Sequence, residues 1–454
     1  MSVSIVILAA GQGTRMYSDK PKVLHQLAGK SLLEHVYHTA MDIPHREIHI
    51  VYGHGGEQVP DEMQHLQANW VEQKEQLGTA HAVEQALPAI PDVDEVLILY
   101  GDVPLITAQS LQALIAAASE SGFALMTAYL EDPRGYGRII RDDIDNVLAI
   151  VEDKDADDEQ RRICEINTGL MVVKADLLKR WIAAIENNNK QKEYYLTDIV
   201  ALAIKDGVNV NSILAEASIE IQGINNRVQL SEAERYYQLV QAHHLMQHGV
   251  GLMDPSRFDL RGDLEVGRDI VFDINVIFEG RVKLGNNISI GANCYIKDCI
   301  IGDDTVILPN TMIDNAVIGK SCRVGPFARI RPDSTLSDEV HIGNFVEIKK
   351  TEVGSGSKIN HLSYVGDSHV GQHTNIGAGV ITCNYDGANK HQTIIGDNVF
   401  VGSDAQLIAP VTISSGATIA AGTTVSKNVA ENALAITRPE QREIKKWKRP
   451  TKKS

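Results

Sequence analysis

Apolar residues in the first half of the chain form buried-strand patterns separated by amphipathic helical patterns. Mainly apolar runs at Val3–Leu8, 47–52 and 95–100 are typical of strands that are buried on both faces. Ser31 and Glu34 have the spacing of a capping box, which predicts that a helix begins there. This alternation predicts an α/β fold with a mainly parallel, Rossmann-like sheet, in which ligands bind beyond the carboxyl ends of the strands.

A different period appears in the second half, where an aliphatic residue recurs about every six positions between Ile270 and Val425. No helix has a period of six, whereas short strands joined by tight turns do, and each aliphatic side chain then points inward. The pattern therefore predicts hexapeptide repeats. The recurring residues, each followed by glycine, include Ile290, Ile301, Ile318, Val324, Val353, Val365, Val370, Ile376, Ile395 and Val401.

The two patterns are separated by residues 227–248, which are rich in Gln, Glu, Arg, Leu and His and predict one long connecting helix. A chain of 454 residues also exceeds the size at which a single core keeps growing. We therefore expect a first domain at 1–226, a helical linker at 227–248, and a repeat domain at 249–454 that ends in a basic tail.

Net charge and cysteine usage indicate which kinds of partner and which cellular compartment to expect. A formal charge of −16 argues against non-specific binding to nucleic acid or to an anionic membrane. We find no signal-peptide pattern and no apolar run long enough to span a bilayer. The five cysteines lack CxxC spacing, which favours reduced thiols over a disulfide framework or a zinc site. These features predict a cytoplasmic protein that binds anionic ligands through local cations.

The first apolar run ends in a loop of small residues that is suited to phosphate. Small side chains at 9–11 and at Gly13 let backbone N–H groups approach a phosphate, and Arg15 and Lys22 supply positive charge. The Gly-Lys-Ser/Thr of a Walker loop is missing, and Met16 stands where a dinucleotide fingerprint has its third glycine. A plain strand-to-helix turn is the alternative interpretation.

Asp102 follows the apolar run at 95–100, and two interpretations of it stay open. The carboxylate caps the next turn, or it binds Mg²⁺, which prefers hard oxygens and takes only one or two protein ligands in such sites.

The phosphate loop together with the following residues as far as Leu24 resembles the signature of sugar-1-phosphate nucleotidyltransferases. These enzymes couple an NTP to a sugar 1-phosphate and release pyrophosphate. The resemblance implies Mg²⁺ on Asp102 and Asn225, with Arg15 and Lys22 as catalytic cations. It further indicates the uridine-specific branch, with the Gln73 amide both donating to and accepting from the base. The residues implied to bind UTP or UDP-N-acetylglucosamine are Leu8, Ala9, Ala10, Gly11, Gly13, Lys22, Gln73, Gly78, Thr79, Tyr100, Gly101, Asp102, Gly137, Glu152, Asn167 and Asn225.

The hexapeptide pattern resembles left-handed parallel β-helix acyltransferases, in which three hexapeptides make one triangular coil. About nine or ten coils at roughly 4.8 Å each would span on the order of 45 Å. A purely structural solenoid is the alternative, since such prisms also serve as trimerisation stems. His361 favours a catalytic role for the repeats over a purely structural one. An imidazole titrates near working pH, and this one precedes the inserted polar loop at 382–390.

Over its whole length the chain resembles bifunctional bacterial transferases that acetylate glucosamine 1-phosphate with acetyl-CoA and then couple the product to UTP, for peptidoglycan and lipopolysaccharide synthesis. The resemblance implies a homotrimer with His361 as the base for acetyl transfer. The basic tail at 442–453 either grips CoA or is simply solvated. The implied glucosamine 1-phosphate ligands are Arg331, Lys349, Tyr364 and Asn375. The implied acetyl-CoA contacts are Ala378, Asn384, Tyr385, Ser403, Ala421 and Arg438.

Two rival functions remain. The first is a nucleotidyltransferase whose β-helix is only regulatory, which Gln73 and His361 disfavour. The second is a non-enzymatic scaffold like the translation-factor exchange subunits built from the same two domains, which the phosphate loop and Asp102 disfavour.

Overall fold

The N-terminal unit is built on one main sheet, whose strands follow the apolar runs of the sequence. The strands of this unit are β1 (Val3–Leu8), β2 (Gln26–Leu27), β3 (Lys30–Ser31), β4 (Ile48–Gly53), β5 (Asn69–Gln73), β6 (Glu95–Tyr100), β7 (Phe123–Tyr129), β8 (Arg138–Arg141), β9 (Val147–Val151), β10 (Glu165–Lys174) and β11 (Asn211–Leu214). The computed structural model describes residues 2–11, 13–53, 56–437 and 440–452.

The main sheet has the order β11-β7-β10-β6-β1-β4-β5, and β8 and β9 extend it from β10. Its central pairings are parallel, with Leu8 of β1 opposite both Val51 and Tyr100. Strand β10 instead runs antiparallel to β6 and to β7. The mainly parallel sheet expected from the sequence is therefore confirmed, and the carboxyl ends of β1, β4, β5 and β6 meet at one edge.

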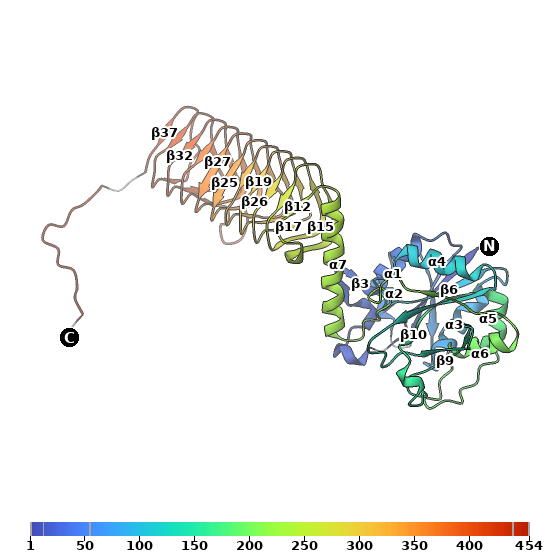
Figure 1. Ribbon diagram of the computed structural model, residues 1–454. Coiled ribbons are helices and arrows are strands. Elements are labelled where there is room, and N and C mark those ends of the chain that lie inside the picture. Colours follow the sequence, from blue (N-terminus) through green and yellow to red (C-terminus); the bar gives the residue numbers. More distant parts are fainter. Residues whose placement is uncertain (1, 12, 54–55, 438–439, 453–454) are drawn as a thin grey trace. The chain divides into compact units, whose positions relative to one another are not determined.

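Helices cover both faces of this sheet, because successive side chains of a strand point to opposite sides. One face packs α1 (Leu32–Met41), α2 (Gln58–Glu62) and α4 (Ala108–Ala118) against Ile5 and Ile7. The other packs α3 (Thr79–Ala86), α5 (Ala175–Ile182) and α6 (Asp198–Lys205) against Val6 and Leu8, as Figure 1 shows. The expected capping box begins α1: the Glu34 N–H donates to Ser31 Oγ, and the Ser31 N–H donates to the Glu34 carboxylate.

Helix α7 (Arg227–Gln247) occupies the stretch in which one long helix was predicted. The chain divides into two compact units at Tyr237–Gln238, within this helix. Ala233 packs with Leu27 and Ile224 of the first unit, whereas the Gln238 amide bonds to the Leu260 backbone in the second. The first compact unit thus extends past residue 226. No helix in the described ranges is both long and apolar enough to cross a bilayer.

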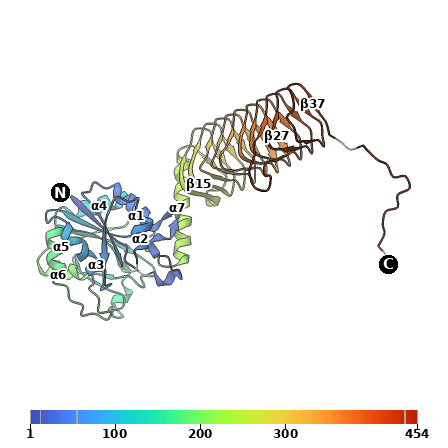
Figure 2. The ribbon, with the colours of Figure 1, turned by 180° about the vertical axis from the view of Figure 1, so that it is seen from behind.

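The second unit is a stack of parallel coils, visible from opposite sides in Figures 1 and 2. Partners in neighbouring coils are usually 17 or 18 residues apart, as in Val271 with Ser289 and Ile290 with Ile307. One sheet runs along the stack through β12 (Gly251–Leu252), β14 (Val271–Phe272), β16 (Ser289–Ile290), β19 (Val306–Ile307), β22 (Arg323–Val324), β25 (His341–Asn344), β27 (Lys358–His361), β29 (Asn375–Ile376), β32 (Phe400–Val401), β35 (Thr418–Ile419) and β37 (Leu434–Ala435).

The remaining strands of this unit form the other faces of the coils. They are β13 (Phe258–Glu265), β15 (Val276–Leu284), β17 (Tyr295–Lys297), β18 (Ile300–Ile301), β20 (Met312–Asp314), β21 (Ala316–Ile318), β23 (Arg329–Ile330), β24 (Ser334–Leu336), β26 (Glu347–Val353), β28 (Tyr364–Val370), β30 (Ile381–Cys383), β31 (Thr393–Ile395), β33 (Gln406–Ile408), β34 (Val411–Ile413) and β36 (Thr424–Val425). Short 3₁₀ turns occur at Thr14–Met16, Lys22–Leu24, Leu87–Ala89, Gln160–Arg162 and Pro255–Arg257.

The recurring aliphatic residues point into the stack, as predicted. Those that the sequence pattern singles out, from Ile290 to Val401, are all buried in one continuous core. Asn375 pairs with Phe400, an offset of 25 residues, so the polar segment at 384–390 is an insertion that leaves the repeat. The fold is the expected α/β domain followed by hexapeptide coils, consistent with a left-handed parallel β-helix. The five cysteines are unpaired, with Cys294, Cys299 and Cys322 buried and Cys164 exposed.

Candidate functional site

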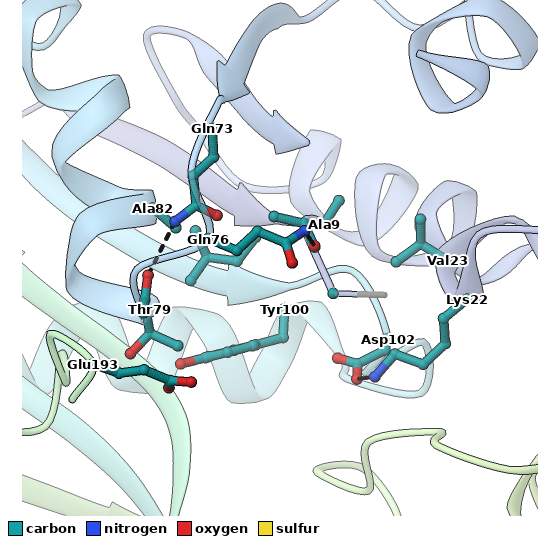
Figure 3. Close-up of a pocket in the computed structure, with 14 residues that line it drawn as sticks. Ala9, Lys22, Val23, Gln73, Gln76, Thr79, Ala82, Tyr100, Asp102 and Glu193 are labelled. Atoms are coloured by element: carbon teal, nitrogen blue, oxygen red, sulfur yellow. Dashed lines mark hydrogen bonds and ion pairs between the residues drawn. The ribbon is translucent and has the colours of Figure 1, made fainter. Parts of the chain in front are cut away.

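A cavity of about 390 Å³ lies at the carboxyl edge of the main sheet, where the sequence predicts a ligand (Figure 3). The phosphate loop, the end of β5, the start of α3 and the end of β6 all contribute to its wall. The lining residues are Leu8, Ala9, Ala10, Gly11, Lys22, Val23, Gln73, Gln76, Gly78, Thr79, Ala82, Tyr100, Asp102 and Glu193. Ten of these residues, Asp102 among them, were predicted to bind the nucleotide, and the structure brings them together around one cavity.

A second cavity of about 230 Å³ shares Tyr100 and Asp102 with the first, so the two adjoin. Arg15 and Asn225 line this second cavity. Its other lining residues are Val103, Arg134, Gly135, Tyr136, Thr168, Ile221, Gly223 and Gln229. Asp102 therefore lies at the junction of two spaces, each of which is bordered by a basic side chain.

Two oxygens converge on one cation at this junction. The Lys22 ammonium donates to the Asp102 carboxylate and, at 3.0 Å, to Asn225 Oδ1. Arg15 Nη2 donates to the same Asn225 oxygen at 3.1 Å. The Lys22 and Asp102 side chains are only 12% and 16% exposed. A carboxylate and an amide oxygen that already share one positive charge fit the donor set that Mg²⁺ prefers.

The backbone fixes the direction of the Asn225 oxygen. Asn225 Nδ2 donates to the Gly223 carbonyl at 3.0 Å, so Oδ1 is the atom turned to Lys22. The Ile224 N–H donates to the Asp102 carbonyl at 2.8 Å, which ties this segment to the end of β6. No cluster of three or more His, Cys, Asp or Glu side chains with metal-site geometry occurs in the described ranges. A magnesium ion here would thus rely on these two oxygens, water and phosphate.

Internal hydrogen bonds hold the end of the first cavity at which the nucleobase was predicted to bind; we call this the base end. Gln73 is only 2% exposed, and its Nε2 lies 3.1 Å from both the Gly78 carbonyl and His81 Nδ1. The amide donors of Gln73 are therefore occupied within the protein, which corrects the expectation that Gln73 both donates to and accepts from a base. Gln76 Nε2 donates to the Ala10 carbonyl at 2.7 Å and so joins this segment to the phosphate loop.

Gly137, Glu152 and Asn167, which were also implied to bind UDP-N-acetylglucosamine, are neighbours of one another, although none of the three lines either cavity described above. The Asn167 N–H donates to the Gly137 carbonyl at 2.8 Å, and a Cβ on Gly137 would lie 3.6 Å from Glu152 Oε1. Thr197 Oγ1 donates to the same Glu152 oxygen at 3.0 Å. Burial nevertheless raises the pKa of the Glu152 carboxyl, because it disfavours the charge.

Gly13 and Gly101 were also predicted to contact the nucleotide, but they are not among the residues that line either cavity. Gly13 has a φ of +60°, and a Cβ there would lie 2.6 Å from Lys22 Cβ. Glycine is therefore required for the loop to pack against the Lys22 stem. The Gly101 N–H donates to the Leu8 carbonyl at 2.9 Å.

Sequence reasoning missed two polar residues of the first cavity, Gln76 and Glu193. Gln76 lies in the base segment and was detectable as a second amide near Gln73. Glu193 reaches the cavity from a loop before α6, and no local pattern marks it, because only the folded sheet brings that loop to the edge.

In the repeat domain, several predicted residues form a column along one corner of the coils. The Gly379 N–H donates to the His361 carbonyl, the Asp404 N–H to the Ala378 carbonyl, and the Gly422 N–H to the Ser403 carbonyl. The residues at equivalent places of four successive coils are therefore His361, Ala378, Ser403 and Ala421. Their backbones lie in line, with a rise of roughly 4.8 Å per coil.

The imidazole of His361 is oriented by a residue that the sequence analysis missed. Nδ1 lies 3.0 Å from Asn344 Oδ1 on the preceding coil. Because an amide oxygen only accepts, Nδ1 carries the proton and a neutral ring leaves Nε2 with its lone pair. His361 is exposed, so Nε2 is open to a ligand.

Three of the predicted sugar-phosphate residues and Asn384 gather on the neighbouring face, held by two acidic residues. Arg331 Nη1 donates to Glu347 Oε1 at 2.7 Å, and Lys349 Nζ to Asp367 Oδ2 at 3.0 Å. Asn384 Nδ2 bonds to Asp367 and, at 3.2 Å, to the Tyr364 hydroxyl.

The hydrogen bonds in this group favour the charged forms of Asp367 and Lys349. Burial opposes ionisation of Asp367, but the hydrogen bonds from Lys349 and Asn384 outweigh it and lower the carboxyl pKa. The bond to Asp367 in turn raises the pKa of Lys349. Asn375 lies instead on the His361 face, opposite Lys358. Tyr385 is 61% exposed in the inserted loop, and Arg438 lies outside the described residues.

Comparisons with known proteins agree with this division of the chain. Residues 5–168 match the MobA-like NTP transferase domain, residues 265–353 the C-terminal domain of GMPPB, and residues 392–427 the bacterial transferase hexapeptide with six repeats. A solved structure of a UDP-glucose pyrophosphorylase complexed with UDP-glucose matches 52% of this chain and 98% of that chain, with 16% identity and a TM-score of 0.43, too low to carry an argument. The chain thus carries a nucleotidyltransferase domain followed by transferase-type hexapeptide repeats.

Proposed function

We propose that the protein is a bifunctional transferase that acetylates glucosamine 1-phosphate and then joins the N-acetylated product to UTP, giving UDP-N-acetylglucosamine and pyrophosphate. The observation that carries the proposal is the convergence of Asp102 and Asn225 on the Lys22 ammonium, at the junction of two cavities. One cavity offers small residues and a buried amide to a nucleotide. The other offers Arg15 to the phosphate of a second substrate.

In the nucleotidyl step, the phosphate oxygen of the sugar 1-phosphate attacks the α-phosphorus of UTP in line, and pyrophosphate leaves. Positioning and charge neutralisation carry most of such a reaction. Arg15 and Lys22 neutralise the phosphates, and backbone N–H groups of residues 10 and 11 hold them, since the Ala9 N–H already donates to the Val51 carbonyl. Asp102 and Asn225 would hold Mg²⁺, which stabilises negative charge that develops on phosphate oxygens. When the nucleotide binds, the Lys22 ammonium moves away from the Asp102 and Asn225 oxygens and contacts the phosphates instead.

In the acetyl step, His361 acts as general base. Asn344 keeps the proton on Nδ1, so Nε2 accepts a proton from the sugar amine as that amine attacks the acetyl thioester. A backbone N–H near Ala378 stabilises the oxyanion, and CoA leaves as the thiol. Arg331, Lys349, Tyr364 and Asn384 bind the sugar phosphate. Ala378, Ser403 and Ala421 form a straight track along which the extended arm of acetyl-CoA approaches His361, with Tyr385 beside it.

We further propose a homotrimer whose acetyl site is shared between chains. Apolar side chains are exposed on the outer faces of the coils, among them Ile300, Met312, Phe345 and Leu362. Such residues are typical of surfaces that are covered in an assembly. Flat prism faces packed by a closed rotation would cover them symmetrically.

One assay tests the proposal: the purified protein receives glucosamine 1-phosphate, acetyl-CoA, UTP and Mg²⁺, and free CoA and pyrophosphate are measured. We expect both products, with pyrophosphate dependent on prior acetylation. Pyrophosphate from supplied N-acetylglucosamine 1-phosphate without CoA release in the full mixture would leave a nucleotidyltransferase with a structural β-helix. Release of neither product would contradict both activities.

A further inference from the structure

His81 is not among the residues assigned to the nucleotide site, yet it contacts the side chain at the base end of the cavity. It lies on the first turns of α3, and its Nδ1 is 3.1 Å from Gln73 Nε2. The other partner of that nitrogen is the Gly78 carbonyl, also at 3.1 Å. Since a carbonyl oxygen only accepts, the atom facing Gly78 must be the amide nitrogen, and the orientation of the Gln73 amide is set.

The frame around this amide is rigid. Gly78 has a φ of +123°, and a Cβ there would lie 2.5 Å from the Tyr194 carbonyl oxygen. The Tyr194 N–H donates to the Leu77 carbonyl and the Ala80 N–H to the Tyr194 carbonyl, which clamps the backbone on either side of Gly78. Gln73 itself is buried at the end of β5. The position of the Gly78 oxygen is therefore fixed before any ligand binds.

We propose that His81 is the positioning residue that makes Gln73 a pure hydrogen-bond acceptor and thereby selects uracil. One amide hydrogen of Gln73 goes to Gly78 and the other to the lone pair of His81 Nδ1, so only Oε1 is left for the base. Figure 3 draws the nitrogen of Gln73 on the dashed bond and its oxygen turned away from that bond.

An acceptor at this place discriminates between pyrimidines. Uracil carries a hydrogen on N3 and donates it to Oε1, whereas N3 of cytosine presents a lone pair and is repelled. A site built to pair with a polar group rejects an analogue that leaves it unpaired. If Gln73 lost its bond to His81, the amide would be freer to turn and present nitrogen to cytosine.

The inference rests on the proposed uridylyl transfer, and its test measures binding of UTP and of CTP separately from turnover. Titration calorimetry on the full-length protein compares wild type with His81→Leu, which removes the acceptor, and His81→Asn, whose Oδ1 replaces Nδ1 as acceptor. Gln85→Leu is the matched control, because Gln85 on the same helix bonds to the His81 carbonyl. We expect wild type to prefer UTP, His81→Leu to reduce the UTP-to-CTP affinity ratio at least tenfold, and His81→Asn and Gln85→Leu to keep it within about threefold.

A ratio in His81→Leu equal to that of wild type overturns the inference. Should His81→Leu fail to fold, wild type is titrated with N3-methyl-UTP, which lacks the N3 hydrogen and should bind as weakly as CTP; binding equal to that of UTP overturns the acceptor role. The proposed function fails separately: a wild type that prefers UTP but releases no pyrophosphate contradicts the activity and leaves base selection standing. If wild type binds UTP and CTP equally and yet releases pyrophosphate, the inference about His81 fails and the proposed activity stands.

Discussion

The two candidate sites are built in opposite ways. In the N-terminal unit the groups line concave cavities at the edge of a sheet, and the Lys22 ammonium bonds to both Asp102 and Asn225. In the repeat domain the groups lie on the outside of the coils, where His361 and Tyr385 are exposed. A parallel sheet brings many loops to one edge, which forms a concave site within one chain. A stack of coils presents flat outer faces.

This difference predicts how each of the two proposed activities depends on assembly. A concave site surrounds and orients its ligand groups within one chain, so it needs no second chain. Groups on a flat outer face lack an opposite wall, and a neighbouring prism or the C-terminal segment would have to supply one. Four experiments test whether the two sites differ in this way.

Asp102→Ala should have the largest effect. Without this carboxylate the oxygen pair that would hold Mg²⁺ is lost, and we expect uridylyl transfer to fall by about 10³-fold or more while acetyl transfer is unchanged. Pyrophosphate release and CoA release from the same preparation measure both activities, so the second is the internal control. Near-normal pyrophosphate release at low Mg²⁺ would remove Asp102 from the metal site.

Mixed assemblies test whether the acetyl site needs two chains. His361→Ala should lose about 10²- to 10⁴-fold of acetyl transfer as expected for a general base, and a chain truncated after Ala435 should be comparably inactive. Co-expressed, the two variants should regain acetyl transfer, because some sites then combine an intact His361 with an intact tail. His369→Ala, which alters an exposed histidine of a nearby strand, is the control for His361→Ala. Mixed assemblies proved by tag pull-down that stay inactive would contradict the shared site.

Truncation tests the autonomy of the concave site. Residues 1–247 should retain uridylyl transfer, since the repeat domain supplies none of its groups. Residues 1–227 should also fold and act, with activity several-fold lower, because Ala233 no longer packs on Leu27 and the Asn225 N–H loses its bond to Gln229 Oε1. Pyrophosphate release and thermal melting compare both with the full chain. Soluble, folded 1–247 without activity would show that the site is not self-contained.

Glu152→Gln should give the smallest change. Burial raises the folded-state pKa of this carboxyl, so its ionised form disfavours folding near neutral pH. The amide should therefore raise the melting temperature at pH 7 by about 2–4 °C, and the gain should disappear at pH 4, where the wild-type carboxyl is largely protonated. Calorimetric melts at both pH values check this, with the exposed Asp132→Asn as control. An equal gain at pH 4 would exclude charge burial as the cause.

The sequence alone determined those features that arise from short-range regularities. The bounds of β1, the capping box at Ser31 and the inward aliphatic residues of the coils follow from periodicity, since strand alternation and the six-residue repeat leave a direct trace in the order of residues. The phosphate loop and Asp102 were recognisable for the same reason, as each directly follows an apolar run.

Which distant side chains meet depends on the tertiary fold. It placed Glu193 in the first cavity, set Asn344 against His361, and occupied both donors of Gln73 with Gly78 and His81. It also placed the Lys22 ammonium between Asp102 and Asn225. Such contacts join residues that are neighbours only after strands pair and coils stack. Their geometry is set by packing and hydrogen-bond direction, for which the order of residues carries no local signal.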